Sequence, residues 1–498
     1  MKSHRGKREL LGNRKAFVTV YMLFASLVML PMVGLAIDFS VLYSVKGRLQ
    51  LACDAGAIGA GGLVQRSTDV TDPTTNANLR NAVQRFFNAN FSPAPWRASQ
   101  LSYNSSITQD NTTKVRTIFV TASYNVPMLF MRVLGVNNST VAAQAIAKLR
   151  FVNLILVVDR SGSVTRTGSG TLTNPQIIQN ALNTFVGDST TSVFKNGRDV
   201  IGMVTFGGNY NLDYAPSTNF QTSSPNITTA INNITFNTNN STNTGEGLYQ
   251  GWYQLTQLSQ AGALNVIVLI TDGRPSAFTG QFAVDSGSPC TNRTDKLGVV
   301  SSSVTNPFPP PSNRTKRGVL NFLYAGVTDE TQTWVSNSAG CSFVGDSSRV
   351  TNDIHTIPTN VGPQDHKTGT SVPSVTSFTA GSGYYAATSD LTDAVQVRYT
   401  AFNYAFNVAK AIRQDATNAP VIYCIGLNFD TSAYPSEEPL DADFLATIAN
   451  DPNYRSTGKP SGVYQAGQTP GKYYDVSYSG LESALQDIAG QILRLSAH

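Results

Sequence analysis

Cysteine, histidine and charged residues are all scarce in this chain of 498 residues. The four cysteines and four histidines are scattered, and their spacings match neither a zinc site nor a cysteine-rich scaffold. No Gly-x-x-x-x-Gly-Lys-Ser/Thr phosphate loop occurs, which argues against a P-loop ATPase. His355 and His366 lie in a loop-rich stretch, and no serine, histidine and acid form a catalytic pattern. We therefore expect a protein that is not an enzyme.

Charged residues amount to only 13%, whereas serine, threonine, asparagine and glycine are abundant. Such a neutral, hydroxyl-rich surface is more typical of the cell exterior than of the cytosol. The net charge of +5 arises entirely in residues 1–15, which hold six basic residues and one acidic residue. The remainder is balanced in charge, and the sequence therefore predicts no nucleic-acid partner.

Residues 16–37 form an uncharged, mostly apolar run of 22 residues. At about 1.5 Å per helical residue such a run spans a bilayer, and the basic residues before it should stay in the cytoplasm. The sequence thus predicts a single-pass protein of the inner (plasma) membrane. Its N-terminus would be cytoplasmic, and everything after Asp38 would be periplasmic or extracellular. A signal peptide cleaved near Gly34-Leu35-Ala36 is the alternative.

The cysteines fit this compartment. Cys290 and Cys341 lie in one loop-rich stretch, where an oxidising environment favours a disulfide between them. Cys424 stands in the apolar segment 421–425 and is expected to be a buried small hydrophobe. Cys53 follows the membrane helix and is expected either to pack in the interior or to cross-link two chains.

The most informative motif is Asp159-Arg160-Ser161-Gly162-Ser163, which follows the apolar run 154–158. One carboxylate and two hydroxyls at alternate positions can converge on Mg²⁺, which prefers oxygen ligands. Taken alone, Ser-Gly-Ser after a strand is usually only a turn.

Two further segments strengthen the prediction of a metal site. Residues 240–248 form a polar loop that opens a helix and contains Thr242 and Thr244, and the apolar run 266–271 ends at Asp272. Ligands of parallel α/β sheets bind outside the carboxyl ends of the strands. Asp159 and Asp272 are therefore expected at the same edge of one sheet.

Strands and helices alternate from residue 152 on, which indicates an α/β fold with a doubly wound, mostly parallel sheet. We predict a basic tail (1–15), a transmembrane helix (16–37), a small α+β region (38–150) and an α/β domain (151–498). The pattern lapses at about 275–392 into a loop-rich insertion, interpreted as a specificity lid beside the metal edge or a mobile surface excursion. The last helix, over 481–495, should bury the stripe Leu481, Leu485, Ile488, Ile492 and Leu495.

The order D-x-S-x-S, T-N-T-G and strand-T-D-G resembles the von Willebrand factor type A domain with its metal-ion-dependent adhesion site. The resemblance implies Mg²⁺, with Mn²⁺ or Ca²⁺ as substitutes. It implies that Ser161, Ser163 and Thr242 bind the ion directly, with Thr244 as the second candidate for the threonine. Asp159 and Asp272 would bind directly or through water.

The N-terminal third resembles the TadE/TadG-like proteins of tight-adherence (Flp) pilus assembly. The similarity rests on Gly12-Asn13, on Gly34-Leu35-Ala36-Ile37-Asp38 and on the Leu-Gln-Leu-Ala-Cys-Asp-Ala segment at 49–55. The stretch 127–131, Leu134-Gly135 and residues 140–145 extend it. A membrane anchor followed by a metal-site domain matches the TadG-like arrangement in particular.

Together these features predict a membrane-anchored, metal-dependent module that binds the Asp or Glu of a protein partner among pilus or envelope components. Five protein ligands leave one position of an octahedral ion open for that carboxylate. The alternative is a structural pilus or envelope component whose metal only stabilises the fold.

Overall fold

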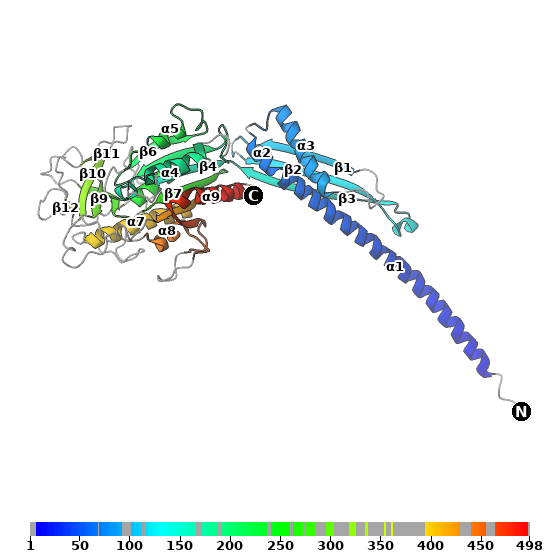
Figure 1. Cartoon of the computed structure of the whole chain (residues 1–498). Helices are drawn as coiled ribbons and strands as arrows, with labels where there is room; N and C mark the ends of the chain where they lie inside the picture. Colours follow the sequence, from blue (N-terminus) through cyan, green and yellow to red (C-terminus); the bar gives the residue numbers. More distant parts are fainter. Residues whose placement is uncertain are drawn as a thin grey trace. The chain divides into compact units, whose positions relative to one another are not determined.

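The computed structural model describes residues 6–67, 69–91, 101–111, 113, 115–165, 172–187, 192–236, 241–258, 260, 262–272, 274–283, 295–302, 318–324, 334–336, 353–354, 360–361, 394–428, 440–454 and 464–496. The chain divides into two compact units, one formed mainly by residues up to Leu149 and one mainly by Arg150–Ser496 (Figure 1). Cys290 and Cys341, and with them the expected disulfide, lie outside the described residues.

The first unit combines helices with a three-stranded sheet of order β1-β2-β3. Its elements are α1 (Gly6–Gly59), α2 (Gly61–Arg66), α3 (Pro73–Asn90), β1 (Leu101–Gln109), β2 (Val115–Pro127), the 3-10 turn η2 (Met131–Leu134) and β3 (Asn138–Arg150). Asp72 caps α3 by accepting a hydrogen bond from the Thr75 amide, and Pro73 supplies the first helical residue. Strand β2 buries every second residue, so one face of the sheet packs against the helices.

Helix α1 is long and apolar enough to cross a membrane, with a mean hydropathy of 2.2 in its most apolar window. Its large apolar side chains from Phe17 to Ile37 are exposed, as lipid contact requires. Further along α1, Val45, Leu49 and Cys53 are buried against the rest of the unit. The same helix thus supplies both a candidate membrane span and part of the core of the first unit.

The second unit is built on a six-stranded sheet of order β15-β14-β7-β4-β5-β6. Its strands are β4 (Val152–Asp159), β5 (Val200–Phe206), β6 (Tyr210–Ser217), β7 (Leu264–Thr271), β14 (Val421–Asn428) and β15 (Lys472–Ser477). All neighbours are parallel except the edge pair β5–β6. Every residue of β4, β5 and β7 is buried, as expected for strands covered on both faces. The predicted α/β fold with a mostly parallel sheet is confirmed.

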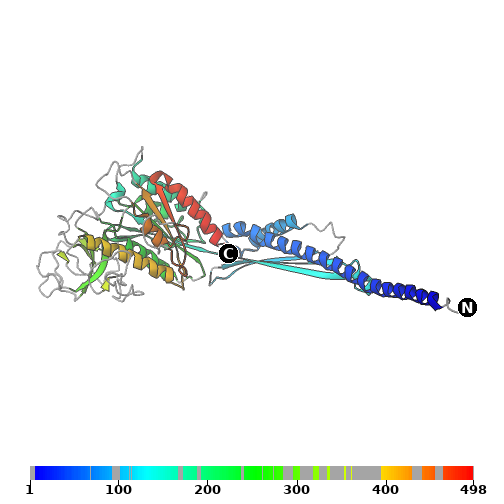
Figure 2. The same ribbon diagram turned by 90° about the horizontal axis from the view of Figure 1, so that it is seen from below.

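Two layers of helices enclose this sheet. Its helical segments are α4 (Asn174–Leu182), the π turn η4 (Asn183–Gly187), α5 (Ile227–Asn232), α6 (Thr244–Leu258), α7 (Ala394–Gln414), α8 (Ala442–Ala449) and α9 (Leu481–Ser496), with short 3-10 turns η3 (Gly162–Thr165) and η6 (Tyr478–Gly480). One apolar cluster joins α6, α7 and α8 to one face, and a second joins α4, α5 and α9 to the other. Figure 2 shows α9 (red) and α7 (yellow) on opposite sides of the sheet.

The insertion contains strands where the sequence indicated only loops. Strands β8 (Ala277–Ala283), β9 (Asp295–Ser302), β10 (Gly318–Tyr324), β11 (Trp334–Ser336), β12 (Asp353–Ile354) and β13 (Asn360–Val361) form a second sheet, antiparallel throughout. Phe278 and Val300 are fully buried in the cluster that contains α6 and α7. The start of the insertion is therefore part of the core.

The last helix differs from its predicted stripe at one position. Leu481, Leu485, Ile488 and Ile492 are buried, but Leu495 is 40% exposed and Ser496 is buried instead. A helical stripe advances by three or four residues, and here the last step is four. Cys424 and Cys53 are both buried free thiols. Burial raises the pKa of the Cys424 thiol, as expected of a small hydrophobe in a core strand.

Candidate functional site

The two predicted aspartates lie at the carboxyl ends of neighbouring parallel strands. Asp159 ends β4, and Asp272 follows Thr271, the last residue of β7. In the register of these strands Val158 pairs with Ile270, which brings the next residues of both strands to the same edge. Both carboxylates are almost completely buried.

Asp159 is held by hydrogen bonds from its own loop and from β7. Its Oδ1 accepts from the backbone amide of Ser161 at 2.8 Å, and its Oδ2 accepts from the Thr271 hydroxyl at 2.6 Å. Burial, followed by the charge of Asp272, raises the pKa of Asp159 from 3.8 to about 7. Two buried carboxylates that repel each other in this way are stabilised by a divalent cation between them.

The two predicted serines connect to the second aspartate. Ser161 Oγ lies 2.9 Å from Ser163 Oγ, and Ser163 Oγ donates to Asp272 Oδ1 at 2.7 Å. The other oxygen of Asp272 accepts from the hydroxyl of Tyr478 at 2.8 Å. The structure therefore brings together four of the five predicted ligands, with Tyr478 as a support that the sequence did not indicate.

Thr242 is the fifth predicted ligand. Hydrogen bonds on two sides hold its loop at the same edge of the sheet. Asn243 donates its backbone amide to Gly207 O at 2.7 Å, directly after Phe206, the register partner of Asp159. On the other side, the Thr242 amide donates to Ser276 Oγ at 2.9 Å, and Thr242 O accepts from the amides of Ser276 and Ala277. No hydrogen bond links the Thr242 side chain to another described residue.

Two hydroxyls of this loop are buried without a hydrogen-bond partner among the described residues: those of Ser241 and Thr244. Thr244 begins α6 and is fully buried, whereas Thr242 keeps 6% of its surface exposed. The residual exposure favours Thr242 over Thr244 as a residue that a bound ion and an incoming partner could reach.

A buried network of hydrogen bonds holds the loop that contains Thr242. Asn243 Nδ2 donates to Gly208 O at 3.2 Å and to Thr279 Oγ1 at 2.9 Å, and its Oδ1 accepts from the Glu246 amide. Tyr404 of α7 donates its hydroxyl to the carboxylate of Glu246 at 3.2 Å. Burial and the charge of Glu246 raise the pKa of Tyr404 well above its ordinary value. Through Thr279 of β8, the insertion is thus tied to the threonine loop.

The donor set at this edge fits a hard divalent cation. It consists of two carboxylates and several small hydroxyls, the oxygen ligands that Mg²⁺ prefers. Within the described residues, no group of three or more His, Cys, Asp or Glu side chains is placed to hold a metal ion. The candidate site is not a cluster of that kind, because it offers two carboxylates and completes its donor set with hydroxyl groups.

Arg160, the second residue of the motif, hydrogen-bonds to the segment that follows β5. Its Nη2 donates to Asn209 Oδ1 at 3.0 Å, and the charges of Asp213 and Asp159 act on its guanidinium group. Burial lowers the pKa of Arg160 and raises that of Asp213. The Arg160 side chain is therefore held by the turn that follows β5.

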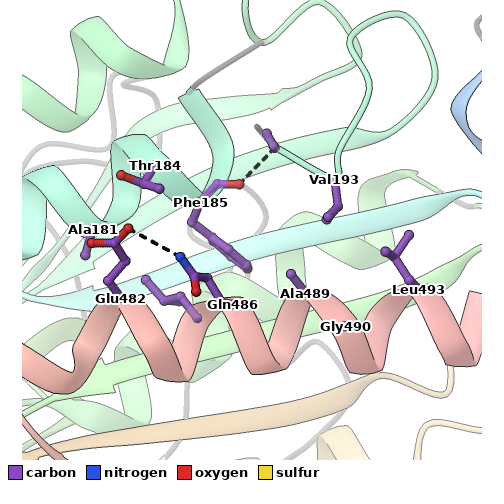
Figure 3. Close-up of a pocket in the computed structure, with 11 residues that line it drawn as sticks. Ala181, Thr184, Phe185, Val193, Glu482, Gln486, Ala489, Gly490 and Leu493 are labelled. Atoms are coloured by element: carbon purple, nitrogen blue, oxygen red, sulfur yellow. Dashed lines mark hydrogen bonds between the residues drawn. The ribbon is translucent and has the colours of Figure 1, made fainter. Parts of the chain in front are cut away.

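A separate apolar cavity of about 310 Å³ lies between α9 and the helical segment α4–η4 (Figure 3). Phe185, Leu485 and Leu493 are among its lining residues, and Gln486 donates to Glu482 at 3.4 Å beside it. It contains none of the predicted ligands. The cavity and the polar edge are therefore distinct features of the second unit.

Two family models each match a part of the chain. Residues 153–305 match the von Willebrand factor type A domain, and residues 17–63 match the putative Flp pilus-assembly TadE/G-like family. The chain thus carries a TadE/G-like segment followed by a type A domain, as expected of a TadG-like protein. No curated protein matches the chain.

Several solved structures show weak similarity. The PilB minor pilin from Streptococcus sanguinis is 15% identical, with 81% of this chain and 80% of that chain covered and a TM-score of 0.35. The vWF domain of the type V pili tip protein Mfa5 from Porphyromonas gingivalis is 14% identical, with coverages of 70% and 97% and a TM-score of 0.34. Manganese-loaded TRAP protein from Plasmodium vivax is 10% identical, with coverages of 68% and 74% and a TM-score of 0.31. Similarity at this level carries no argument about function.

Proposed function

We propose that this TadG-like chain is a membrane-anchored protein-binding module of pilus assembly or surface adhesion that holds a partner's Asp or Glu through Mg²⁺. The observation that carries the proposal is the buried pair Asp159 and Asp272, joined through Ser161 and Ser163 at the carboxyl edge of the sheet. An Mg²⁺ ion bound there would offer an open coordination position to a carboxylate. The proposal includes no catalytic step.

Each side chain has a separate task in this proposal. Ser161, Ser163 and Thr242 offer hydroxyl oxygens, and Asp159 and Asp272 supply negative charge directly or through water. Thr271 and Tyr478 orient the two carboxylates by donating to the oxygen that faces away from the serines. Helix α1 would anchor the chain in the inner membrane, with the type A domain in the periplasm or outside the cell.

The contacts of the insertion with the Thr242 loop favour a role of the insertion beside the ion. Its first residues hold the backbone of Thr242, and its strands β8 and β9 pack on α6 and α7. We propose that it acts as the specificity lid beside the ion. Because Phe278 and Val300 belong to the core, removal of the whole insertion would disturb folding, and single substitutions are the better test.

The first experiment is calorimetric titration of residues 150–498 with Mg²⁺ and Mn²⁺. We expect saturable binding, and we then expect proteins captured from an envelope fraction to be released by a chelator. If a folded sample binds neither ion, the adhesion-type function is wrong. If ions bind and raise the melting temperature but chelation releases no partner, the structural alternative is favoured.

The identity of the threonine ligand is also testable. Thr242→Val should lower the affinity for Mg²⁺ about tenfold or more, because one oxygen ligand is lost. Thr244→Val should leave the affinity nearly unchanged and should not destabilise the domain, because the Thr244 hydroxyl is buried and unpaired among the described residues. The reverse order of affinities in calorimetry would assign the ligand to Thr244.

A further inference from the structure

The turn between β2 and β3 carries an apolar surface that the binding site does not use. Leu129, Phe130, Val133 and Leu134 are all large apolar residues with exposed side chains, and Val133 is 87% exposed. They lie in and around η2, at the tip of two strands whose own side chains are largely covered on one face. A cluster of exposed apolar residues at a loop tip requires a partner or a lipid surface.

The turn is fixed against α1 by a buried carboxylate. Asp38 is 2% exposed and accepts hydrogen bonds from the backbone amides of Leu129, Phe130 and Met131 at 2.7 to 3.0 Å. Its carboxylate therefore satisfies three successive donors that the turn leaves unpaired. The position of the apolar tip relative to α1 is set by these bonds within the first unit.

One helical turn before Asp38, the ring of Phe130 lies directly on α1. Gly34 is buried at this point, and a Cβ atom there would come within 2.6 Å of Phe130. Glycine is thus required for the close approach of the ring to the helix backbone. Gly34 and Asp38, four residues apart, share the helix face that meets the turn.

The position of this contact along α1 indicates that a lipid surface covers the apolar turn. The uncharged run of the helix ends at Ile37, so Gly34 lies inside the candidate membrane span and Asp38 at its border. The roughly 17 residues from Phe17 to Gly34 rise about 26 Å, close to the thickness of the hydrocarbon layer. The apolar tip therefore lies level with the end of the span, where Phe130 contacts α1 at Gly34.

We propose that the β2–β3 turn is a second membrane-contacting element, which inserts Leu129, Phe130, Val133 and Leu134 into the interfacial layer of the bilayer beside α1. Arg132, exposed in the same turn, is placed to meet lipid phosphates, as basic residues do at membrane borders. Two adjacent contacts would fix the tilt and rotation of the first unit on the membrane, which a single helix cannot do. The inference rests on the membrane anchor of the proposed function and not on its metal site.

The test uses single tryptophan substitutions in the full chain, reconstituted in phosphatidylethanolamine and phosphatidylglycerol vesicles with brominated acyl chains. Bromine quenches tryptophan on contact, and the three native tryptophans are subtracted with the unsubstituted chain. Val133→Trp is the main variant, and Leu134→Trp, also strongly exposed, replaces it if the first does not fold. Leu27→Trp reports the span itself, and Asn111→Trp reports the exposed β1–β2 turn at the other end of β2.

We expect Val133→Trp to be quenched at least about threefold more than Asn111→Trp and to shift its emission to the blue, as interfacial tryptophan does. Quenching of Leu27→Trp without quenching of Val133→Trp would overturn the proposal while leaving the anchor intact. A blue shift of Val133→Trp without lipid quenching would also overturn it, because a protein would then cover the turn. If Leu27→Trp were not quenched either, the membrane anchor itself would be wrong.

Discussion

Replacement of Asp159 by asparagine is expected to abolish Mg²⁺ binding while the domain stays folded. The substitution keeps the size of the side chain and removes one of the two buried charges of the site. Since a hard cation is held chiefly by carboxylate charge, the affinity should fall about 100-fold or more. Calorimetry measures this loss, and circular dichroism verifies the fold.

The same substitution has a second consequence for stability in the absence of the ion. Asp159 has a pKa of about 7 in the folded protein against 3.8 ordinarily, so the folded state binds more protons between these values. Without Mg²⁺, stability should therefore be lost as pH rises from about 4 through 7. Asp159→Asn should remove this pH dependence, and denaturant titrations in chelator at pH 5 and pH 8 measure it.

Asp199→Asn is the matched control for both effects. Asp199 is also fully buried, but it stands before β5, at the amino end of the sheet, where it pairs with Arg198. Its substitution should destabilise the domain and leave Mg²⁺ affinity unchanged. Equal losses of ion affinity in both variants would mean that general destabilisation, and not a ligand, accounts for the Asp159 result.

Asn243→Ala is expected to lower Mg²⁺ affinity about 10- to 100-fold although Asn243 is no predicted ligand, because residues that orient ligands contribute on that scale. Its amide group joins Gly208, in the turn between β5 and β6, to Thr279 of β8. Loss of these bonds frees the adjacent Thr242 to move. The variant should also lose about 1 to 3 kcal/mol of stability, because buried polar groups are left unpaired.

Asn226→Ala is a control that separates the loss of Mg²⁺ affinity from the loss of stability. Like Asn243, which accepts from the Glu246 amide of α6, Asn226 accepts a hydrogen bond from the amide of the third residue of a helix. The donor is Thr229 of α5, at 2.8 Å. Its removal should cost about 1 kcal/mol of stability and leave calorimetric ion binding as it was. If Asn243→Ala behaved like Asn226→Ala, the proposed tie between the insertion and the threonine loop would have no bearing on the site.

The sequence alone determined the parts of this protein that depend on local pattern. Fully apolar runs that end in Asp159 and Asp272 predict buried parallel strands, because only strands covered on both faces lack alternation. Parallel strands of a doubly wound sheet present their carboxyl ends at one edge, so Asp159 and Asp272 could be placed at the same edge before any coordinates were known. The uncharged run at 16–37 likewise predicts a long helix, which the structure extends to Gly59.

Tertiary structure decided whatever depends on contacts between residues far apart in the chain. Tyr478 donates a hydrogen bond to Asp272, which lies 206 positions earlier in the chain, and no local sequence pattern predicts such a bond. The antiparallel sheet of the insertion escaped prediction because its strands are separated by long stretches rich in serine, threonine, proline and glycine. Their order depends on pairing with one another and on packing against α6 and α7. The hydrogen bonds between Asp38 and the β2–β3 turn likewise could not be predicted, since more than 90 residues separate the carboxylate from the amides that donate to it.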